Sequence, residues 1–363
     1  MNSYKLNRIK NSLKKRFDIK GDLRDLLNPY FLIKSFYLTR YCRVTLDIEK
    51  FEQIFLMISK DINNEKAILL ASPIWKSSLK AKLNKISSLL IEKKFIELKK
   101  IYEDLFLDDL MEGAVSHQNS ISLISKISQT TRFFSRSRKL LKIKENFDKD
   151  LILSLNNIIY SKNFNFGRPF AFKIHYLTNI ESLDEQFFAL KITELIKNNC
   201  YQEIVFIGDG AGFLAPLLIE INNFYHENNN CRYRIIDFLY FAISSYLRIK
   251  KSNNSIIINL PETLHKYEAG TIDPKNLPNI NGKRLIVNQD SFPEMKKESI
   301  VSYTKNTASS TDIASYNQIP QNLDDSFADY LNILKDLNYK LLSIDKSPIR
   351  ENYYVSFHTI RSC

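Results

Sequence analysis

The stretch EIVFIGDGAGFL, from Glu203 to Leu214, contains three of the eight glycines of this 363-residue chain: Gly208, Gly210 and Gly212. An apolar run typical of a strand precedes these glycines, and a helix-like run follows them. Glycine adopts backbone conformations that other residues avoid, and it lets a ligand approach bare backbone. A strand, a glycine turn and a helix in this order therefore predict a nucleotide-like ligand at the helix N-terminus.

The spacing of the three glycines indicates which ligand to expect. A dinucleotide fingerprint, G-x-G-x-x-G, needs its third glycine at position 213, where this chain has Phe213. The form G-x-G-x-G instead resembles that of the class I methyltransferases, which use S-adenosylmethionine (SAM). SAM is the expected cofactor, with Gly208, Asp209, Gly210 and Gly212 as candidate binding residues. A glycine turn that holds no ligand remains the alternative.

Strands and helices alternate from residue 186 onward. We expect strands at 204–207, 233–236, 256–258, 284–287, 313–316, 340–344 and 353–359, and helices at 186–197, 213–225, 239–249 and 323–337. This alternation predicts a parallel sheet that binds ligands at the carboxyl ends of its strands. The last two strands form a hairpin, because the segment 345–352 is too short for a parallel crossover. The expected fold is α/β, with a Rossmann-like seven-stranded class I methyltransferase sheet and one reversed strand.

The N-terminal part of the chain has a helical pattern. Apolar residues between positions 83 and 105 recur at spacings of three and four. We therefore predict an N-terminal all-α domain over residues 1–155 and a SAM-dependent methyltransferase domain over 156–363. The loop-like segment NFNFGRP, at 163–169, links the two parts.

Composition limits the partners and the location. The four cysteines form no C-x-x-C pair, which argues against a zinc site or a disulfide framework and fits a reducing cytosol. No run is long and apolar enough to span a bilayer. The net charge of +12 invites a nucleic-acid partner, but no RNA-binding signature accompanies it, so nucleic acid is disfavoured. The charge also suits anionic glycans or peripheral contact with the inner face of the cytoplasmic membrane.

Asp237 closes the second predicted strand, one helix and one loop after Gly212. A carboxylate at this place can accept hydrogen bonds from both ribose hydroxyls of an adenosine, so Asp237 is a cofactor-binding candidate. The alternative is that Asp237 caps the following helix.

The fourth predicted strand ends in VNQDSFPEM, at 287–295, which places polar residues where the binding crevice of the sheet opens. Methyl transfer to a hydroxyl needs a base near the acceptor. Asp290, Glu294 and His265 are the catalytic candidates, with His175 as a further imidazole. Helix capping is the alternative for Asp290, and a place in the first turn of the helix for Glu294. A divalent metal bridged by the two carboxylates is compatible with the spacing but not indicated by it.

Two other acceptor chemistries do not fit this segment. Adenine N6 methylation in this superfamily uses an (N/D)-P-P-(Y/F) tetrad after the fourth strand, where this chain reads NQDS. Cytosine C5 methylation needs a cysteine nucleophile, and no cysteine lies between Cys231 and Cys363. An oxygen acceptor remains.

Several segments resemble the bacterial sugar O-methyltransferase family, which decorates surface polysaccharides. They are IVFIGDGAGFLAPLL, IIDFLYFAISSYL, VNQDSFPEM, SYNQ at 315–318, SPIWKSSL and NFGRPF. VNQDSFPEM is the most specific, being similar to N-x-x-S-F-x-E-M. The resemblance implies SAM as donor and a sugar hydroxyl as acceptor, on a nucleotide-linked or lipid-linked glycan. The implied candidates are Asn288 and Gln289 for the cofactor and Ser291, Asn317, His175 and Arg168 for the substrate.

The chain departs from the family pattern at two places. The proline that follows the second-strand aspartate in the family is absent, and Phe238 and Leu239 stand there instead. Phe206 stands where the family has an acidic residue, two positions before the first glycine. A second segment, INLPETL at 258–264, also resembles a second-strand end, with Asn259 in place of the carboxylate. Two rival functions stay open: an RNA methyltransferase, favoured by charge, and a non-catalytic protein that keeps the fold, favoured by Phe206.

Overall fold

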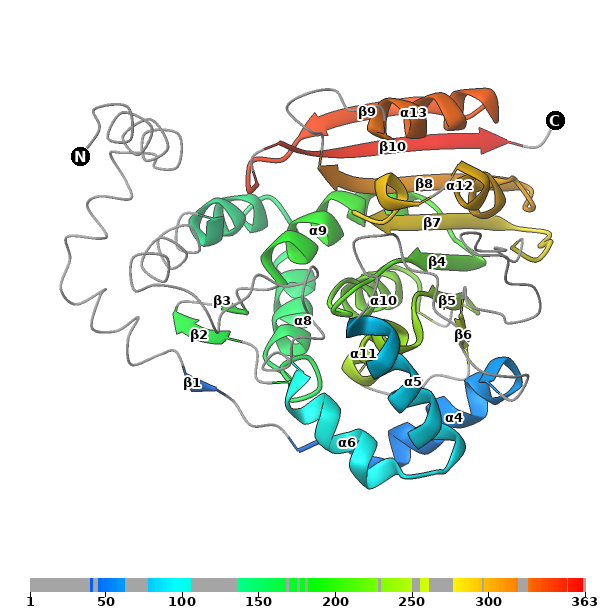
Figure 1. Ribbon diagram of the computed structural model, residues 1–363. Helices are drawn as coiled ribbons and strands as arrows, with labels where there is room; N and C mark the ends of the chain where they lie inside the picture. Colours follow the sequence, from blue (N-terminus) through cyan, green and yellow to red (C-terminus); the bar gives the residue numbers. More distant parts are fainter. Residues whose placement is uncertain are drawn as a thin grey trace, which may run out of the picture.

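The computed structural model describes residues 40–41, 45–62, 78–105, 136–167, 170–174, 177–179, 182–227, 230–249, 255–260, 277–295, 297–318, 326–350 and 352–361. Its main feature is a seven-stranded sheet in the order β6-β5-β4-β7-β8-β10-β9 (Figure 1). The strands are β4 (Glu203–Ile207), β5 (Arg232–Ile236), β6 (Ile256–Asn259), β7 (Lys283–Gln289), β8 (Ser310–Gln318), β9 (Lys340–Lys346) and β10 (Tyr353–Arg361).

The sheet has the predicted topology. β4 pairs in parallel with both β5 and β7, and the parallel pairing extends to β6 on one side and β8 on the other. β10 pairs antiparallel with β8 and with β9, so it is the reversed strand of the seven. The prediction of a Rossmann-like sheet with one reversed strand is confirmed.

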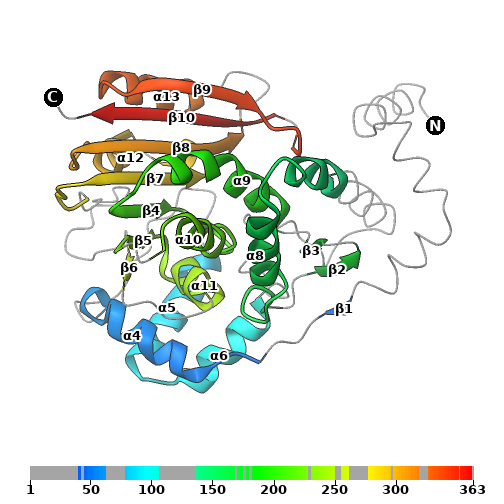
Figure 2. The ribbon, with the colours of Figure 1, turned by 180° about the vertical axis from the view of Figure 1, so that it is seen from behind.

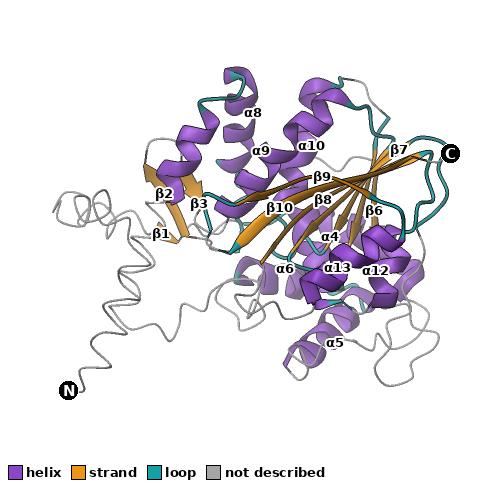
Figure 3. Cartoon of the chain, turned by 90° about the horizontal axis from the view of Figure 1, so that it is seen from above, coloured by secondary structure: helices purple, strands orange, loops and turns teal. Residues whose placement is uncertain are grey.

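Side chains of each central strand alternate between two cores. Ile204 and Phe206 of β4 enter one apolar core, whereas Val205 and Ile207 enter the other. Helices cover both faces, which is why the four residues of β4 after Glu203 are all apolar. Figure 3 shows α8 (Lys149–Ile159), α9 (Leu183–Asn198) and α10 (Leu214–Tyr225) on one side, and α12 (Lys297–Thr304) and α13 (Ser326–Asp336) on the other.

The described N-terminal helices share the first of these cores. They are α4 (Ile48–Ile62), α5 (Ser78–Ile91) and α6 (Phe95–Glu103), and they lie near α11 (Leu239–Arg248) (Figures 1 and 2). The Tyr102 hydroxyl donates to the Tyr240 carbonyl at 2.9 Å, and the Lys50 ammonium donates to the Ile249 carbonyl at 2.6 Å. These helices therefore pack on the sheet domain, and the domain boundary at residue 155 stays a prediction.

Some elements were not predicted. A three-stranded antiparallel sheet joins β1 (Arg40–Tyr41), β2 (Phe170–Ile174) and β3 (Leu177–Asn179), so one short strand lies inside the part predicted to be all helical. A short 3-10 helix, η5 (Phe292–Glu294), and helix α12 follow β7. Within the described ranges, no helix has both the length and the apolar character needed to cross a membrane.

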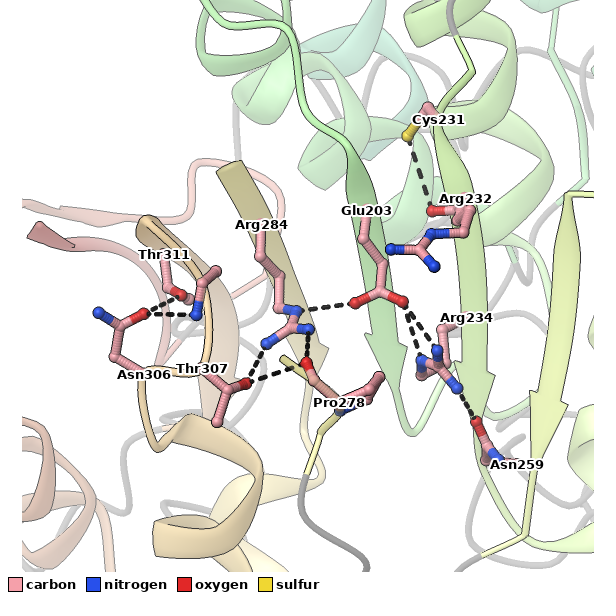
Figure 4. Close-up of polar contacts among 11 residues, drawn as sticks. Glu203, Cys231, Arg232, Arg234, Asn259, Pro278, Arg284, Asn306, Thr307 and Thr311 are labelled. Carbon is pink, nitrogen blue, oxygen red and sulfur yellow. Dashed lines mark hydrogen bonds and ion pairs between the residues drawn. The ribbon is translucent and has the colours of Figure 1, made fainter. Parts of the chain in front are cut away.

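A buried charge cluster joins the three central strands toward their amino ends (Figure 4). The Glu203 carboxylate accepts from Arg234 Nη2 at 2.9 Å and from Arg284 Nε at 2.8 Å. Glu203 and Arg284 are fully buried. Arg284 also donates to the Thr307 hydroxyl and the Pro278 carbonyl. Two guanidinium groups thus share one carboxylate, and we refer to these groups as the Glu203 cluster.

Candidate functional site

The glycine turn after β4 has the backbone that only glycine adopts readily. Gly208, Gly210 and Gly212 have φ values of +68°, +58° and +86°. The Gly208 amide donates to the Ile236 carbonyl of β5 at 3.0 Å, which fixes the start of the turn. Three left-handed residues in five explain why glycine, scarce elsewhere in the chain, is concentrated here.

The three glycines have different surroundings. A Cβ on Gly208 would lie 1.6 Å from Ser291 Oγ, and a Cβ on Gly212 would lie 2.5 Å from the Ser245 Cα in α11. A Cβ on Gly210 would meet no heavy atom within 4 Å. The turn is therefore packed against protein at its two ends, and its open side is at Gly210.

Asp209 bonds to the helix that follows the turn. Its two carboxylate oxygens accept from the amides of Leu214, at 3.0 Å, and Ala215, at 3.3 Å. It thus stabilises the N-terminus of α10, while burial raises its pKa to about 6. Both of its oxygens thus bond to backbone of α10, and its contact with the cofactor stays a prediction.

Asp237 lies beside Gly210. Its Oδ2 accepts from the Gly210 amide at 2.9 Å and its Oδ1 from the Phe238 amide at 2.8 Å. The carboxylate is buried, which raises its pKa to about 8. Asp237 does not cap α11, because Phe238 is the N-cap residue of that helix and Asp237 bonds only its amide; the carboxylate borders the open side of the turn.

The INLPETL segment does not supply the second strand. Its first residues belong to β6, which pairs with β5 and not with β4. β5, which precedes Asp237, is the direct neighbour of β4. Asn259 ends β6 and accepts a hydrogen bond from Arg234.

Asn288 and Ser291 connect the end of β7 to the end of β4 by hydrogen bonds. Asn288 is fully buried, and its amide nitrogen donates to the Ile207 carbonyl at 3.2 Å. Ser291 Oγ donates to the Gly208 carbonyl at 3.2 Å. These two hydrogen bonds therefore hold the start of the glycine turn in place. Gln289, between them in the chain, donates to Glu185 Oε1 at 2.9 Å.

Asp290 connects the ends of three strands. It has a left-handed backbone, with φ +57°, directly after β7. Its Oδ1 accepts from the Gln318 amide at 3.0 Å and its Oδ2 from the Tyr353 hydroxyl at 2.7 Å. Its own amide donates to Asn317 Oδ1 at 3.1 Å. Burial raises the pKa of Asp290, which brings this carboxyl closer to the range useful for a general base.

The remaining predicted residues cannot be placed in the same way. Arg168, His175 and His265 lie outside the described residues, and the side chain of Glu294 does too, although its backbone ends η5. In the part of the chain that the structure describes, no three His, Cys, Asp or Glu side chains gather as a metal site.

Four residues near the turn were not found from the sequence. Arg248 lies between the rings of Phe166 and Phe213, 4.1 and 4.0 Å from their centroids, and its Nε donates to the Ala211 carbonyl at 2.7 Å. The others are Glu185, Gln318 and Tyr353. Arg248 ends a helix and Tyr353 begins the last strand, and neither position carries a motif that marks it.

The strand order and the glycine turn together decide the fold. β4 is central, the turn follows it, and β10 alone among the seven strands is reversed. The chain has the class I methyltransferase fold. No family model matches the sequence, and no curated protein matches it either.

Solved structures similar to this methyltransferase fold cover about half of the chain. A SAM dependent methyltransferase from Aquifex aeolicus is 16% identical over 49% of this chain and 93% of its own, with a TM-score of 0.35. Magnesium protoporphyrin IX methyltransferase from Synechocystis PCC 6803, with bound SAM, is 11% identical over 61% of this chain and 97% of its own, with a TM-score of 0.35. Aeropyrum pernix fibrillarin, with natively bound SAM, is 10% identical over 46% and 73%, with a TM-score of 0.31.

Proposed function

We propose that the protein binds SAM at the glycine turn and transfers its methyl group to a hydroxyl of a sugar. One observation carries the donor part of this proposal: the turn is open at Gly210, and the Asp237 carboxylate borders that opening. The place lies at the carboxyl ends of β4 and β5, next to the point where the strand order reverses. Ligands of open α/β sheets bind at such points.

SAM, the methyl donor, would be held by the backbone of the glycine turn and by the Asp237 carboxylate. The bare backbone at Gly210 permits close approach of the nucleoside, and Asp237 would accept from its ribose hydroxyls. When bound, SAM supplies a methyl group on a positively charged sulfur. The chain's own task is to hold the acceptor oxygen in line with that carbon and to take its proton.

Asp290 is the proposed base. Its carboxylate would take the proton of the acceptor hydroxyl as the oxygen is methylated. Asp290 follows β7, the strand next to β4, so it lies on the same edge of the sheet as the glycine turn. Glu294 remains the alternative base.

The sugar acceptor rests on the resemblance of VNQDSFPEM to sugar O-methyltransferases. We propose a nucleotide-linked or lipid-linked glycan of a surface polysaccharide, methylated in the cytoplasm or at the inner face of the membrane. An RNA acceptor is favoured by the net charge of +12 alone. Transfer of labelled methyl groups to sugar nucleotides, glycolipid extracts and total RNA shows which acceptor is methylated. If the acceptor is RNA, its binding should also weaken steeply as the salt concentration rises.

Asp237→Asn tests the donor site. Calorimetric titration with SAM is expected to show binding to the wild type and about 10- to 100-fold weaker binding to the variant, since a charged acceptor is lost. Ionisation of Asp237 leaves a full acceptor for the ribose, so wild-type affinity is expected to rise as the pH increases through about 8, and the variant should lack that rise. Equal affinity of the two proteins would exclude the ribose role, and no binding of millimolar SAM to the wild type would exclude the enzyme.

Asp290→Asn tests the base. Asparagine tolerates the left-handed backbone of this position, so the fold should persist. We expect kcat to fall by roughly 10²- to 10⁴-fold, as for loss of a general base, with SAM affinity unchanged within about twofold. Glu294→Gln, measured in parallel, decides between the two carboxylates. If neither variant loses activity, the assignment of the base to this segment is wrong.

A further inference from the structure

Glu185 and Gln289 present two buried acceptor atoms that have no partner among the residues the structure describes. Glu185 lies in the first turn of α9, and its Oε1 accepts from Gln289 Nε2 at 2.9 Å. Its other oxygen, Oε2, is buried and has no hydrogen-bond partner among the described residues, and the same is true of Gln289 Oε1. Buried polar atoms are nearly always hydrogen-bonded, so these two acceptors, on side chains that are hydrogen-bonded to each other, indicate that a hydrogen-bond donor binds here.

These two atoms are next to the glycine turn. Asn288 pairs with Ile207, so Gln289 is level with Gly208, where β4 ends. β4 and β7 are the neighbouring strands between which the strand order reverses. The negative charge of Asp209, which follows Gly208, contributes to raising the pKa of Glu185, although burial is the larger cause. The unpartnered acceptors therefore lie near the place proposed for SAM, the methyl donor.

The neighbouring carboxylate, that of Asp184, has arginine partners that Glu185 does not have among the described residues. Asp184 accepts from Arg350 at 3.1 Å and lies 3.9 Å from Arg136. In the described part of the chain, no ion pair joins Glu185 to a lysine or arginine. Arg248 is the nearby cation that interacts with Glu185 electrostatically, but its guanidinium donates to the carbonyls of Ala211 and Phe164. Among the described residues, Glu185 thus has no directly bonded cation.

We propose that Glu185 and Gln289 bind the α-ammonium group of the methionine part of SAM. This inference rests on the proposed function. An ammonium has three N–H donors, and it would satisfy Glu185 Oε2 and Gln289 Oε1 together, whereas a sulfonium has no hydrogen to donate. Phe206, two positions before Gly208, is buried in the core and offers no acceptor, so the carboxylate proposed for the ammonium comes from α9.

Glu185→Gln, measured with three ligands, tests the assignment. The ligands are SAM, S-adenosylhomocysteine, which keeps the ammonium but has no sulfonium, and 5′-methylthioadenosine, which lacks the amino-acid part. We expect the variant to bind the first two about 10- to 100-fold more weakly, as for loss of a charge-assisted hydrogen bond, and to bind the third as the wild type does. Glu194→Gln removes an exposed carboxylate from the same helix and should change none of the affinities.

The outcomes are distinguishable. Equal SAM affinity in the wild type and in Glu185→Gln overturns the assignment, and so does an equal loss for all three ligands, which would indicate a structural role. A loss for SAM but not for S-adenosylhomocysteine would assign Glu185 to the sulfonium and also contradict the proposal. If the wild type binds none of the three, the proposed function fails and this inference with it. Gln289→Met is the second variant, with a smaller but parallel loss for SAM and S-adenosylhomocysteine, and it decides the matter if Glu185→Gln does not fold.

Discussion

Gly212→Ala is expected to destabilise the protein strongly, by about 2–5 kcal/mol. The added Cβ would lie 2.5 Å from the Ser245 Cα and 2.6 Å from its amide nitrogen, and backbone atoms cannot swing aside as a side chain can. The left-handed φ of +86° adds about 1–2 kcal/mol for a residue with a Cβ, and overpacking adds about 1–3 kcal/mol. Together these costs are a large part of the ~5–15 kcal/mol that stabilises a typical domain.

Gly210→Ala is the matched variant, and it is expected to weaken SAM binding while leaving the protein folded. Its Cβ meets nothing within 4 Å, so only the backbone cost of about 1–2 kcal/mol applies, and the protein should fold. The new methyl group occupies the open side of the turn, so SAM affinity is expected to fall at least about tenfold, the effect of losing roughly 1.4 kcal/mol. Urea unfolding and calorimetric titration measure the two effects separately.

A third glycine controls for the substitution itself. A Cβ on Gly282 would meet the movable end of the Gln202 side chain and would lie 2.9 Å from Gln202 Cβ, and Gly282 does not have a left-handed φ. Gly282→Ala should therefore lose some stability but keep all of the donor affinity. Wild-type donor affinity in Gly210→Ala would show that the open side of the turn is not the donor face. Wild-type stability in Gly212→Ala would contradict the packing described for α11.

The fold was predictable because its signals are local. Apolar strands alternate with amphipathic helices along the chain, and the short link between the last two strands requires a hairpin. All seven strands occur in the predicted order, although β8 extends from Ser310 to Gln318 and is longer than the predicted 313–316. Helix α12 was missed because its sequence, KESIVSYT, has little amphipathic pattern.

The arrangement of the site was less predictable, because its contacts join distant positions. The sequence placed Asp237 and the glycine turn correctly at neighbouring strand ends, since that follows from strand order. It could not show that Asp290 receives the hydroxyl of Tyr353, 63 positions away, or that Glu185 meets Gln289, 104 positions away. Nor could it separate Gly210, which is open, from Gly208 and Gly212, which are packed, because that difference depends on what α11 and the β7 end place against the turn.

Glu203→Ala is expected to cost about 3–5 kcal/mol of stability, the usual range for removing one partner of a buried ion pair. The variant leaves the guanidinium groups of Arg234 and Arg284 without their shared carboxylate, and Arg284 is fully buried. Burial already lowers the pKa of Arg284, and Glu203 opposes that shift, so its removal leaves the buried charge uncompensated. The urea midpoint should fall by roughly the stability loss divided by the denaturant slope.

Two controls show whether the stability loss of Glu203→Ala is due to its buried ion pairs: a surface ion-pair variant and the SAM affinity of Glu203→Ala itself. Glu92 pairs with Lys94 at 2.6 Å on the surface, and Glu92→Ala should leave the urea midpoint unchanged, because water screens that pair. The Glu203 cluster lies toward the amino ends of the strands, whereas the glycine turn follows the carboxyl end of β4, so folded Glu203→Ala should bind SAM like the wild type. A wild-type urea midpoint would show that the cluster does not stabilise the sheet. Weaker SAM binding by the folded variant would show that the two edges of the sheet are coupled, which the separate contacts of Glu203 and Gly210 argue against.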